Sequence, residues 1–157
     1  MEKTLLAVST ACYLIKENKV LLIKFNKKWG QVYAPPGGKA KFGETPTECM
    51  IREYKEETGL ILKNPKLKGI SYWNWCGEES GIIYIYVVEG IDSYEGVLTP
   101  ESDEGNLEWV DKNELSSIKQ FDMNQKFQEY LWESGVFEGR FLLNSDDTVK
   151  EYMIRKI

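Results

Sequence analysis

The stretch that decides the fold runs from Gly37 to Leu60 and reads GGKAKFGETPTECMIREYKEETGL. Within it, the string TPTE predicts a helix start, with Thr45 as N-cap, Pro46 at the first helical position and Glu48 completing a capping box. Gly59 predicts the end of the helix. At about 100° per residue, the face expected to pack carries Thr47, Met50, Ile51, Tyr54 and Thr58. The opposite face carries Arg52, Glu53, Glu56 and Glu57.

The carboxylates of this stretch need a compensating charge. Like charges at helical spacing destabilise a helix by about 0.2–0.5 kcal/mol per pair, and Arg52 is a single cation. A hard divalent ion would take oxygen ligands from carboxylates and from a backbone carbonyl, and we expect a Gly37-Gly38 turn to offer such a carbonyl without a side chain in the way. The alternative is that these glutamates form an ordinary solvated helix face.

Apolar and β-branched runs predict strands on both sides of the helix. The expected strands cover residues 4–15 and 20–25 as one hairpin, 68–75 and 82–89 as a second pair, 107–110, and 136–143 with 148–157 as a closing hairpin. Further helices are expected at 111–115 and 124–132, loops at 26–30 and 90–106, and a bent, non-helical segment at 34–38. The length of 157 residues predicts one domain over residues 1–157.

The composition limits the chemistry. With 20 Lys and Arg against 25 Asp and Glu, the net charge of −5 argues against a nucleic-acid polymer as partner. The absence of histidine excludes Ser-His-Asp and Cys-His catalysis and every zinc site that contains histidine. The three cysteines have no metal-binding spacing, and no apolar run is long enough for a membrane span, so we expect a cytoplasmic protein with free thiols.

The stretch 37–60 resembles the Nudix box of the Nudix hydrolases. The matching positions are Gly38, Glu44, Arg52, Glu53, Glu56, Glu57, Gly59 and Leu60. Tyr54 departs from the usual aliphatic residue, but it lies on the predicted packing face. The resemblance implies an α/β fold, an α/β/α sandwich around a mixed sheet, and hydrolysis of a nucleoside diphosphate linked to a further group.

The resemblance also implies a metal site. Glu53, Glu56 and Glu57 would bind Mg²⁺ or Mn²⁺ together with the carbonyl of Gly37. Arg52 would orient a glutamate by a charge-assisted hydrogen bond, and Glu44 would support the loop. The bound metal would lower the pKa of the attacking water.

The strings TPESDE (residues 99–104), LEWV (107–110) and FEGRF (137–141) are similar to MutT-type members, which act on oxidised purine nucleoside triphosphates. The matching loop glutamate is Glu104, which would complete the metal site or act as base. Glu53, Glu57 and Glu104 are all candidate bases, because spacing does not rank carboxylates that share one metal site.

The predicted substrate contacts are less specific. Lys39 and Lys24 are candidate phosphate ligands, and Phe121, Asn124 and Tyr33 are candidate nucleobase contacts. The segment YAPP at 33–36 lacks the asparagine found before the box in the oxidised-purine branch, and the positions of the base-reading aspartates in animal enzymes carry Met123 and Asn124.

The sequence therefore predicts a metal-dependent pyrophosphohydrolase of a nucleoside triphosphate, with 8-oxo-dGTP as one candidate substrate. The alternatives are a dinucleoside polyphosphate, ADP-ribose, a nucleotide sugar or an RNA 5′ end as substrate, or a module that binds a nucleotide without cleaving it. The absence of proline between Pro65 and Pro100 weighs against ADP-ribose. The oligomeric state stays open.

Overall fold

The computed structural model describes residues 5–26 and 29–157 of the chain. Within them, the main sheet has nine strands, in which β11-β10-β6-β7-β1-β2-β3 lie side by side while β4 pairs with β1 and β9 with β2. Their bounds are β1 Ala7–Lys16, β2 Lys19–Phe25, β3 Tyr33–Ala34, β4 Gly37–Lys39, β6 Lys66–Trp75, β7 Glu79–Glu89, β9 Gly105–Asp111, β10 Phe137–Leu143 and β11 Val149–Lys156. The sheet is mixed, because β1 runs parallel to β7 and β10 parallel to β6 while the other pairs are antiparallel.

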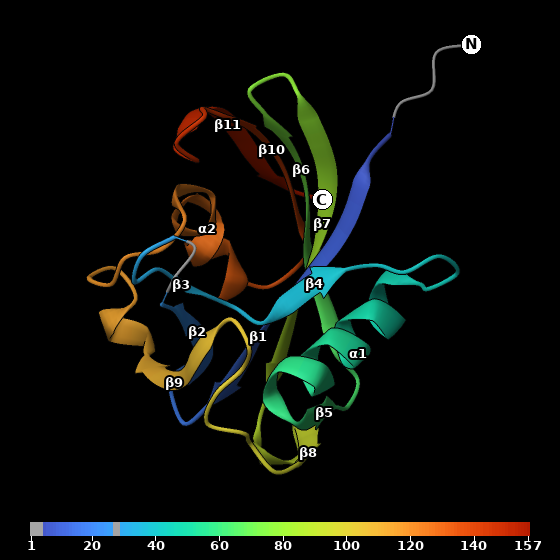
Figure 1. The fold of residues 1–157 in the computed structure, drawn as a ribbon, viewed down its shortest axis with the longest axis vertical. Helices are drawn as coiled ribbons and strands as arrows, with labels where there is room; N and C mark the ends of the chain where they lie inside the picture. The colour runs from blue at the N-terminus through green and yellow to red at the C-terminus, as the bar shows by residue number, and fades with distance from the viewer. Residues whose placement is uncertain (1–4, 27–28) are drawn as a thin grey trace.

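Helices cover both faces of this sheet, as Figure 1 shows. The two α-helices are α1 at Pro46–Thr58 and α2 at Asp122–Phe127. Three 3₁₀ segments occupy Ile91–Ser93, Lys112–Glu114 and Gln128–Leu131, and a small separate sheet pairs β5 (Leu60–Leu62) with β8 (Tyr94–Gly96). The expected α/β/α sandwich around a mixed sheet is therefore confirmed. No helix among the described residues is long and apolar enough to cross a membrane.

The alternation of side chains along β1 divides the core in two. Cys12 and Leu14 pack with Met50 and Tyr54 of α1. The intervening residue Tyr13 points to the other face and packs with Phe127 of α2 and with other buried residues of that side. The two helices are thus held on opposite faces by successive residues of one strand.

Both ends of α1 agree with the sequence. Thr45 accepts a hydrogen bond from the Glu48 N–H while the Glu48 carboxylate accepts one from the Thr45 N–H, and Gly59 ends the helix with φ at 79°. Tyr54 is buried, as predicted for the packing face. The prediction was wrong for Thr47, which is exposed, and it omitted Cys49, which is fully buried. The hydroxyl of Thr47 instead forms a hydrogen bond with the hydroxyl of Tyr86, at 2.9 Å.

Several predicted boundaries moved. The first hairpin forms around Glu17 and Asn18, which both have positive φ as a type I′ turn requires, but the predicted start at Thr4 lies outside the described residues. The predicted loop 76–81 shortens because Cys76 and Gly77 take positive φ, which lets β6 and β7 pair down to Trp75 and Glu79.

Other segments changed type. The bent segment 34–38 ends in strand β4, and the predicted loop 90–106 contains β8, because both segments find a strand partner that is distant in the sequence. The predicted helix at 111–115 is a 3₁₀ turn capped by Asp111, and the predicted helix at 124–132 begins at Asp122 and tightens into a 3₁₀ turn after Phe127.

Candidate active site

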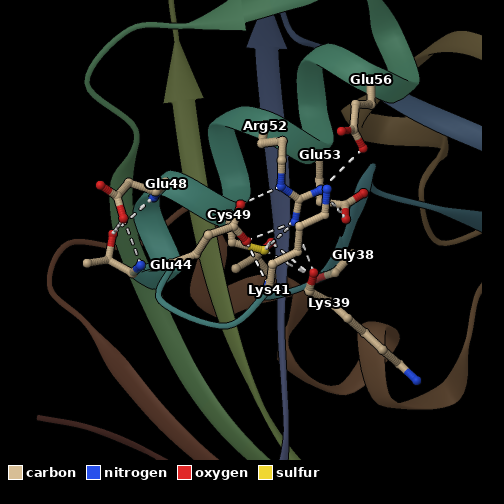
Figure 2. A network of polar contacts seen from close by, with 11 residues as sticks. Gly38, Lys39, Lys41, Glu44, Glu48, Cys49, Arg52, Glu53 and Glu56 are labelled. Atoms are coloured by element: carbon tan, nitrogen blue, oxygen red, sulfur yellow. Dashed lines mark hydrogen bonds and ion pairs between the residues drawn. The ribbon is translucent and has the colours of Figure 1, made fainter.

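Arg52 contacts three carboxylates, those of Glu53 and Glu56 on α1 and that of Glu44 in the loop before it (Figure 2). Its Nη2 lies 2.9 Å from the second oxygen of Glu44 while its Nε donates to the first, so the pair is bidentate. Nη1 lies 2.8 Å from Glu53 and 3.2 Å from the exposed Glu56, and Nη2 also donates to the carbonyl of Lys39. A planar guanidinium with five donors suits this fork, which a lysine would not reproduce.

Glu44 fastens the loop before α1 to the helix. Besides Arg52, its carboxylate accepts a hydrogen bond from the N–H of Lys41 at 2.8 Å. The hydrogen bonds from Arg52, followed by the one from Lys41, lower the pKa of Glu44 to about 2. Glu44 therefore stays ionised and keeps its contact with Arg52 over the whole ordinary pH range.

The two glycines of β4 lie where an added Cβ would come too close to neighbouring atoms. Neither has a positive φ, so the predicted turn at this point is instead a strand. A Cβ on Gly37 would lie 2.0 Å from the carbonyl oxygen of Thr10, and one on Gly38 would lie 2.3 Å from the carboxylate carbon of Glu53. A side chain on Gly37 would clash with the backbone of β1, whereas one on Gly38 would displace the end of the Glu53 side chain.

The orientation of β4 turns the peptide groups of Gly37 toward α1. The N–H of Cys12 donates to the carbonyl of Pro36 and that of Ala40 to the carbonyl of Val8, so the even-numbered residues of this segment bond to β1. The groups of Gly37 then point to the other side, and its N–H donates to Glu57 Oε2 at 2.9 Å. In a strand the carbonyl of a residue points the same way as its N–H, which places the Gly37 carbonyl on the side of Glu57.

Glu57 is the most perturbed carboxylate of the group. Burial raises its pKa to about 8 against the lowering effect of the hydrogen bond from Gly37, and the negative charges of Glu104, Glu53 and Glu56 raise it further. Glu104 is exposed in the loop before β9 and makes no side-chain hydrogen bond with a described residue, yet its charge acts on Glu57 more than those of the two helix neighbours do. The fold thus brings the predicted loop glutamate to the glutamates of α1.

The residues present fit a hard divalent cation in their chemistry. The donors are carboxylates and one peptide carbonyl, which Mg²⁺ and Mn²⁺ prefer, and a carboxyl with a raised pKa lacks the positive charge that would ionise it. The candidate ligands do not converge on one point in this structure. Among residues 5–26 and 29–157, no three Asp, Glu or Cys side chains form a group that could hold a metal ion. Arg52 instead holds the side chains of Glu53 and Glu56.

A pocket of about 300 Å³ begins at Gly37 and extends over β1 toward α2. Its walls are mainly apolar, and its lining residues are Ser9, Thr10, Ala11, Trp29, Ala34, Pro35, Gly37, Ile83, Phe121, Met123, Asn124, Leu143 and Asp147. Two predicted nucleobase contacts, Phe121 and Asn124, therefore lie in the pocket that adjoins the glutamates. The side chain of Asn124 is 7% exposed and makes no hydrogen bond with any residue that the structure describes.

Other predicted contacts lie elsewhere. Tyr33 is absent from the pocket lining, and its hydroxyl donates to Glu108 at 2.8 Å. Lys24 sits 5.5 Å from the centre of the Tyr33 ring, in the same cluster on β2, β3 and β9. Lys39 is exposed at the end of β4, and its side chain extends away from the Arg52 guanidinium in Figure 2. The geometry supports neither Tyr33 as a base contact nor Lys24 as a phosphate contact.

The sequence reasoning missed the pocket residues of β1 and of the C-terminal hairpin. Ser9, Thr10, Leu143 and Asp147 reach the pocket through the sheet order, in which β1 lies beside β7 and β10 beside β6. No local motif marks them. Only the pairing of distant strands places them beside the glycines of the box.

Comparison with known proteins agrees with this geometry. A family model described as the NUDIX domain matches residues 5–152. The chain is 30% identical to the uncharacterized Nudix hydrolase YvcI of Bacillus subtilis, over 92% of each chain. It is 36% identical to an ADP-ribose pyrophosphatase of Methanocaldococcus jannaschii, over 82% of this chain and 76% of that protein.

The same fold occurs in a solved structure. The crystal structure of the mutator MutT protein from Bacillus halodurans matches with a TM-score of 0.86 at 28% identity, and covers 95% of this chain and 97% of that one. This likeness agrees with the predicted resemblance to MutT-type members. On the family model, the relatives and the fold, the chain belongs to the Nudix hydrolase family, whose members cleave phosphoanhydride bonds.

Proposed function

We propose that this Nudix hydrolase is a Mg²⁺- or Mn²⁺-dependent pyrophosphohydrolase that cleaves a nucleoside triphosphate to the monophosphate and pyrophosphate. The observation that carries the proposal is the continuity of the site: one pocket runs from Gly37, beside the glutamates of α1, to Phe121 and Asn124. A nucleotide laid along it has its base at the α2 end and its phosphates at the glutamates. At about 300 Å³ the pocket lies at the lower limit for small-molecule sites, which favours a single nucleoside over a dinucleotide.

The base end of the pocket suits a planar polar ring. Trp29 and Phe121 lie edge to face with ring centres 5.4 Å apart, and both line the pocket. The Asn124 amide makes no hydrogen bond with a described residue and lines the pocket, so it would gain a hydrogen-bond partner when a base enters.

At the phosphate end of the pocket, the carboxylates would bind the metal and activate water. Glu53, Glu56, Glu57, Glu104 and the Gly37 carbonyl would hold the metal, which would neutralise phosphate charge and lower the pKa of a bound water. Arg52 would orient Glu53 and Glu56, and Lys39, exposed at the end of β4, would contact a terminal phosphate. The candidates for the base that takes the proton from water are Glu53, Glu57 and Glu104, with Glu57 carrying the raised pKa that suits a proton acceptor near neutral pH.

A second candidate function is hydrolysis of ADP-ribose. It is favoured by the 36% identity to the protein named ADP-ribose pyrophosphatase in Methanocaldococcus jannaschii. The chemistry at the glutamates would be the same, and only the group beyond the second phosphate would differ.

A substrate panel separates the two. The purified protein is incubated with Mg²⁺ and with GTP, dGTP, 8-oxo-dGTP, ATP, ADP-ribose or a dinucleoside polyphosphate, and the products are resolved by ion-exchange chromatography. We expect a nucleoside triphosphate to give monophosphate and pyrophosphate as the most efficient reaction. Preferred turnover of ADP-ribose to AMP and ribose phosphate, or no turnover of any triphosphate, would overturn the proposal.

A further inference from the structure

The turn of the C-terminal hairpin reaches the nucleotide pocket. Leu143, at the end of β10, and Asp147, in the turn before β11, both line it. The turn is fixed at two points: the N–H of Val149 donates to Asp122 Oδ2 of α2 at 2.8 Å, and the N–H of Cys76 donates to the carbonyl of Leu143 at 3.0 Å. Asp147 is therefore held in a defined position relative to Asn124, which lies two residues after Asp122.

The other polar side chains of this turn are engaged in building it. Asp146 accepts hydrogen bonds from the N–H and the hydroxyl of Thr148 at 3.1 and 2.6 Å, and the Asn144 amide donates to the same hydroxyl at 3.0 Å. The Asp147 carboxylate makes no hydrogen bond or ion pair with any residue that the structure describes. Its backbone has φ at 66°, a conformation that aspartate tolerates better than most residues. Asp146 therefore stabilises the turn, whereas Asp147 lines the pocket.

A carboxylate in this position favours a ligand that presents hydrogen-bond donors to it. It accepts only, no lysine or arginine is found among the described residues that line the pocket, and the other polar side chains of that lining are neutral. A phosphate would be repelled there. The best partner is a pair of adjacent N–H donors, because two parallel hydrogen bonds to the two oxygens are the strongest arrangement for a carboxylate.

Among the common bases, guanine alone offers such an edge, with N1–H beside the 2-amino group. Adenine and cytosine present one amino donor next to a ring acceptor, and the single N–H of uracil lies between two carbonyls. An acceptor facing Asp147 would be repelled by it.

We propose that Asp147 is a specificity-determining residue that accepts hydrogen bonds from the N1–H and 2-amino group of a guanine base. The inference rests on the proposed function to the extent that the pocket holds the base of a nucleotide. Asn124, at the end of the same pocket, would contact another part of the ring.

Binding of nucleoside monophosphates tests this assignment. GMP, IMP, AMP and dGMP are titrated calorimetrically into the wild type, Asp147→Asn and the matched control Asp146→Asn. IMP lacks only the 2-amino group of GMP. We expect the wild type to bind GMP at least about tenfold more tightly than IMP or AMP, Asp147→Asn to lose most of that preference, and Asp146→Asn to keep it. The thermal unfolding midpoint of each variant shows that it is folded, and Asp147→Ala repeats the test if the asparagine variant is not.

Three results would overturn the inference: equal binding of GMP and IMP by the wild type, an unchanged preference in Asp147→Asn, or a change confined to the ratio of GMP to dGMP, which would mean that Asp147 contacts the ribose. Monophosphates are products of every reaction considered above, so this readout does not depend on which substrate is cleaved. A protein that cleaves no triphosphate but loses GMP preference in Asp147→Asn would refute the proposed function and support the inference. Triphosphate turnover without a GMP preference would do the reverse.

Discussion

At the scale of single residues, the fold treats two glutamates of the box in opposite ways. Glu44 receives the fork of Arg52, and its pKa falls to about 2. Glu57 is partly buried and pairs with no described cation, and desolvation raises its pKa to about 8. The charge of Glu44 is already neutralised by Arg52, whereas Glu57 has no cationic partner among the described residues.

This difference predicts how metal-free protein responds to pH. The pKa of Glu57 lies above its unfolded value of 4.5, so its contribution to stability is complete below pH 4.5 and is lost as the pH rises through about 8. No histidine titrates in that window. In EDTA, we expect the thermal unfolding midpoint to decrease as the pH is raised from 5 to 8. In Glu57→Gln, this decrease should be smaller. Parallel curves for wild type and Glu57→Gln would refute the pKa assignment.

The guanidinium of Arg52 predicts a stability effect that charge alone does not explain. Arg52→Lys keeps the charge but loses the simultaneous contacts to Glu44, Glu53 and the Lys39 carbonyl, so partly buried acceptors stay unpaired. We expect a loss of about 1–2 kcal/mol in the free energy of unfolding, measured by urea denaturation. The control is Arg155→Lys, because Arg155 also pairs with a glutamate but is 68% exposed. Equal effects of the two changes would contradict the account.

At the scale of elements, the site depends on how closely β4 approaches α1. Strand β4 brings Gly37 against the backbone of β1, where a Cβ would not fit, and Gly38 against the carboxylate of Glu53. The capped start of α1 at Thr45 and its end at Gly59 set which turn of the helix faces that strand. The close approach, more than any single side chain, puts a peptide carbonyl beside the carboxylates.

Substitution of Gly38 tests this close approach. Gly38→Ala would place its Cβ 2.3 Å from the Glu53 carboxylate carbon, so Glu53 must move. A displacement of about 1 Å at a reacting centre costs on the order of 10²-fold in rate, and we expect a loss of that size in kcat for the best substrate. Gly43→Ala is the control, since its Cβ would meet nothing within 4 Å although its φ of +86° makes the change strained. It should lower stability and leave kcat nearly unchanged, and equal kcat losses would refute the role of the close approach.

At the scale of the whole molecule, local signals predicted more of the fold than of the pocket. The capping box, the Gly59 stop and the burial of Tyr54 follow from residues near one another in sequence, and all three are present. The mixed sheet was expected from the resemblance of one stretch. Strands β5 and β8 were missed because three-residue strands carry too little periodicity to be recognised without their partner.

The pocket depends on contacts between distant segments. Phe121 and Asn124 were identified through the resemblance and do line it, whereas Tyr33 was expected there and instead contacts Glu108. Asp147 had no signal beyond a turn composition, since its place in the pocket lining follows from the position of β10 beside β6. Sequence patterns located the glutamates of α1 well because these lie on one helix, and they located the pocket residues poorly because these come from separate segments.

The central claim is that the glutamates of α1 hold the metal that cleaves a phosphoanhydride bond. Its most direct test is Mg²⁺-dependent turnover of the best nucleotide by wild type, Glu57→Gln and Glu48→Gln. Both changes remove one carboxylate from the same helix, but Glu48 only completes the capping box, a role that glutamine can also fill. We predict that Glu57→Gln lowers kcat by about 10²-fold or more while Glu48→Gln stays close to wild type. Equal activity of wild type and Glu57→Gln would contradict the account.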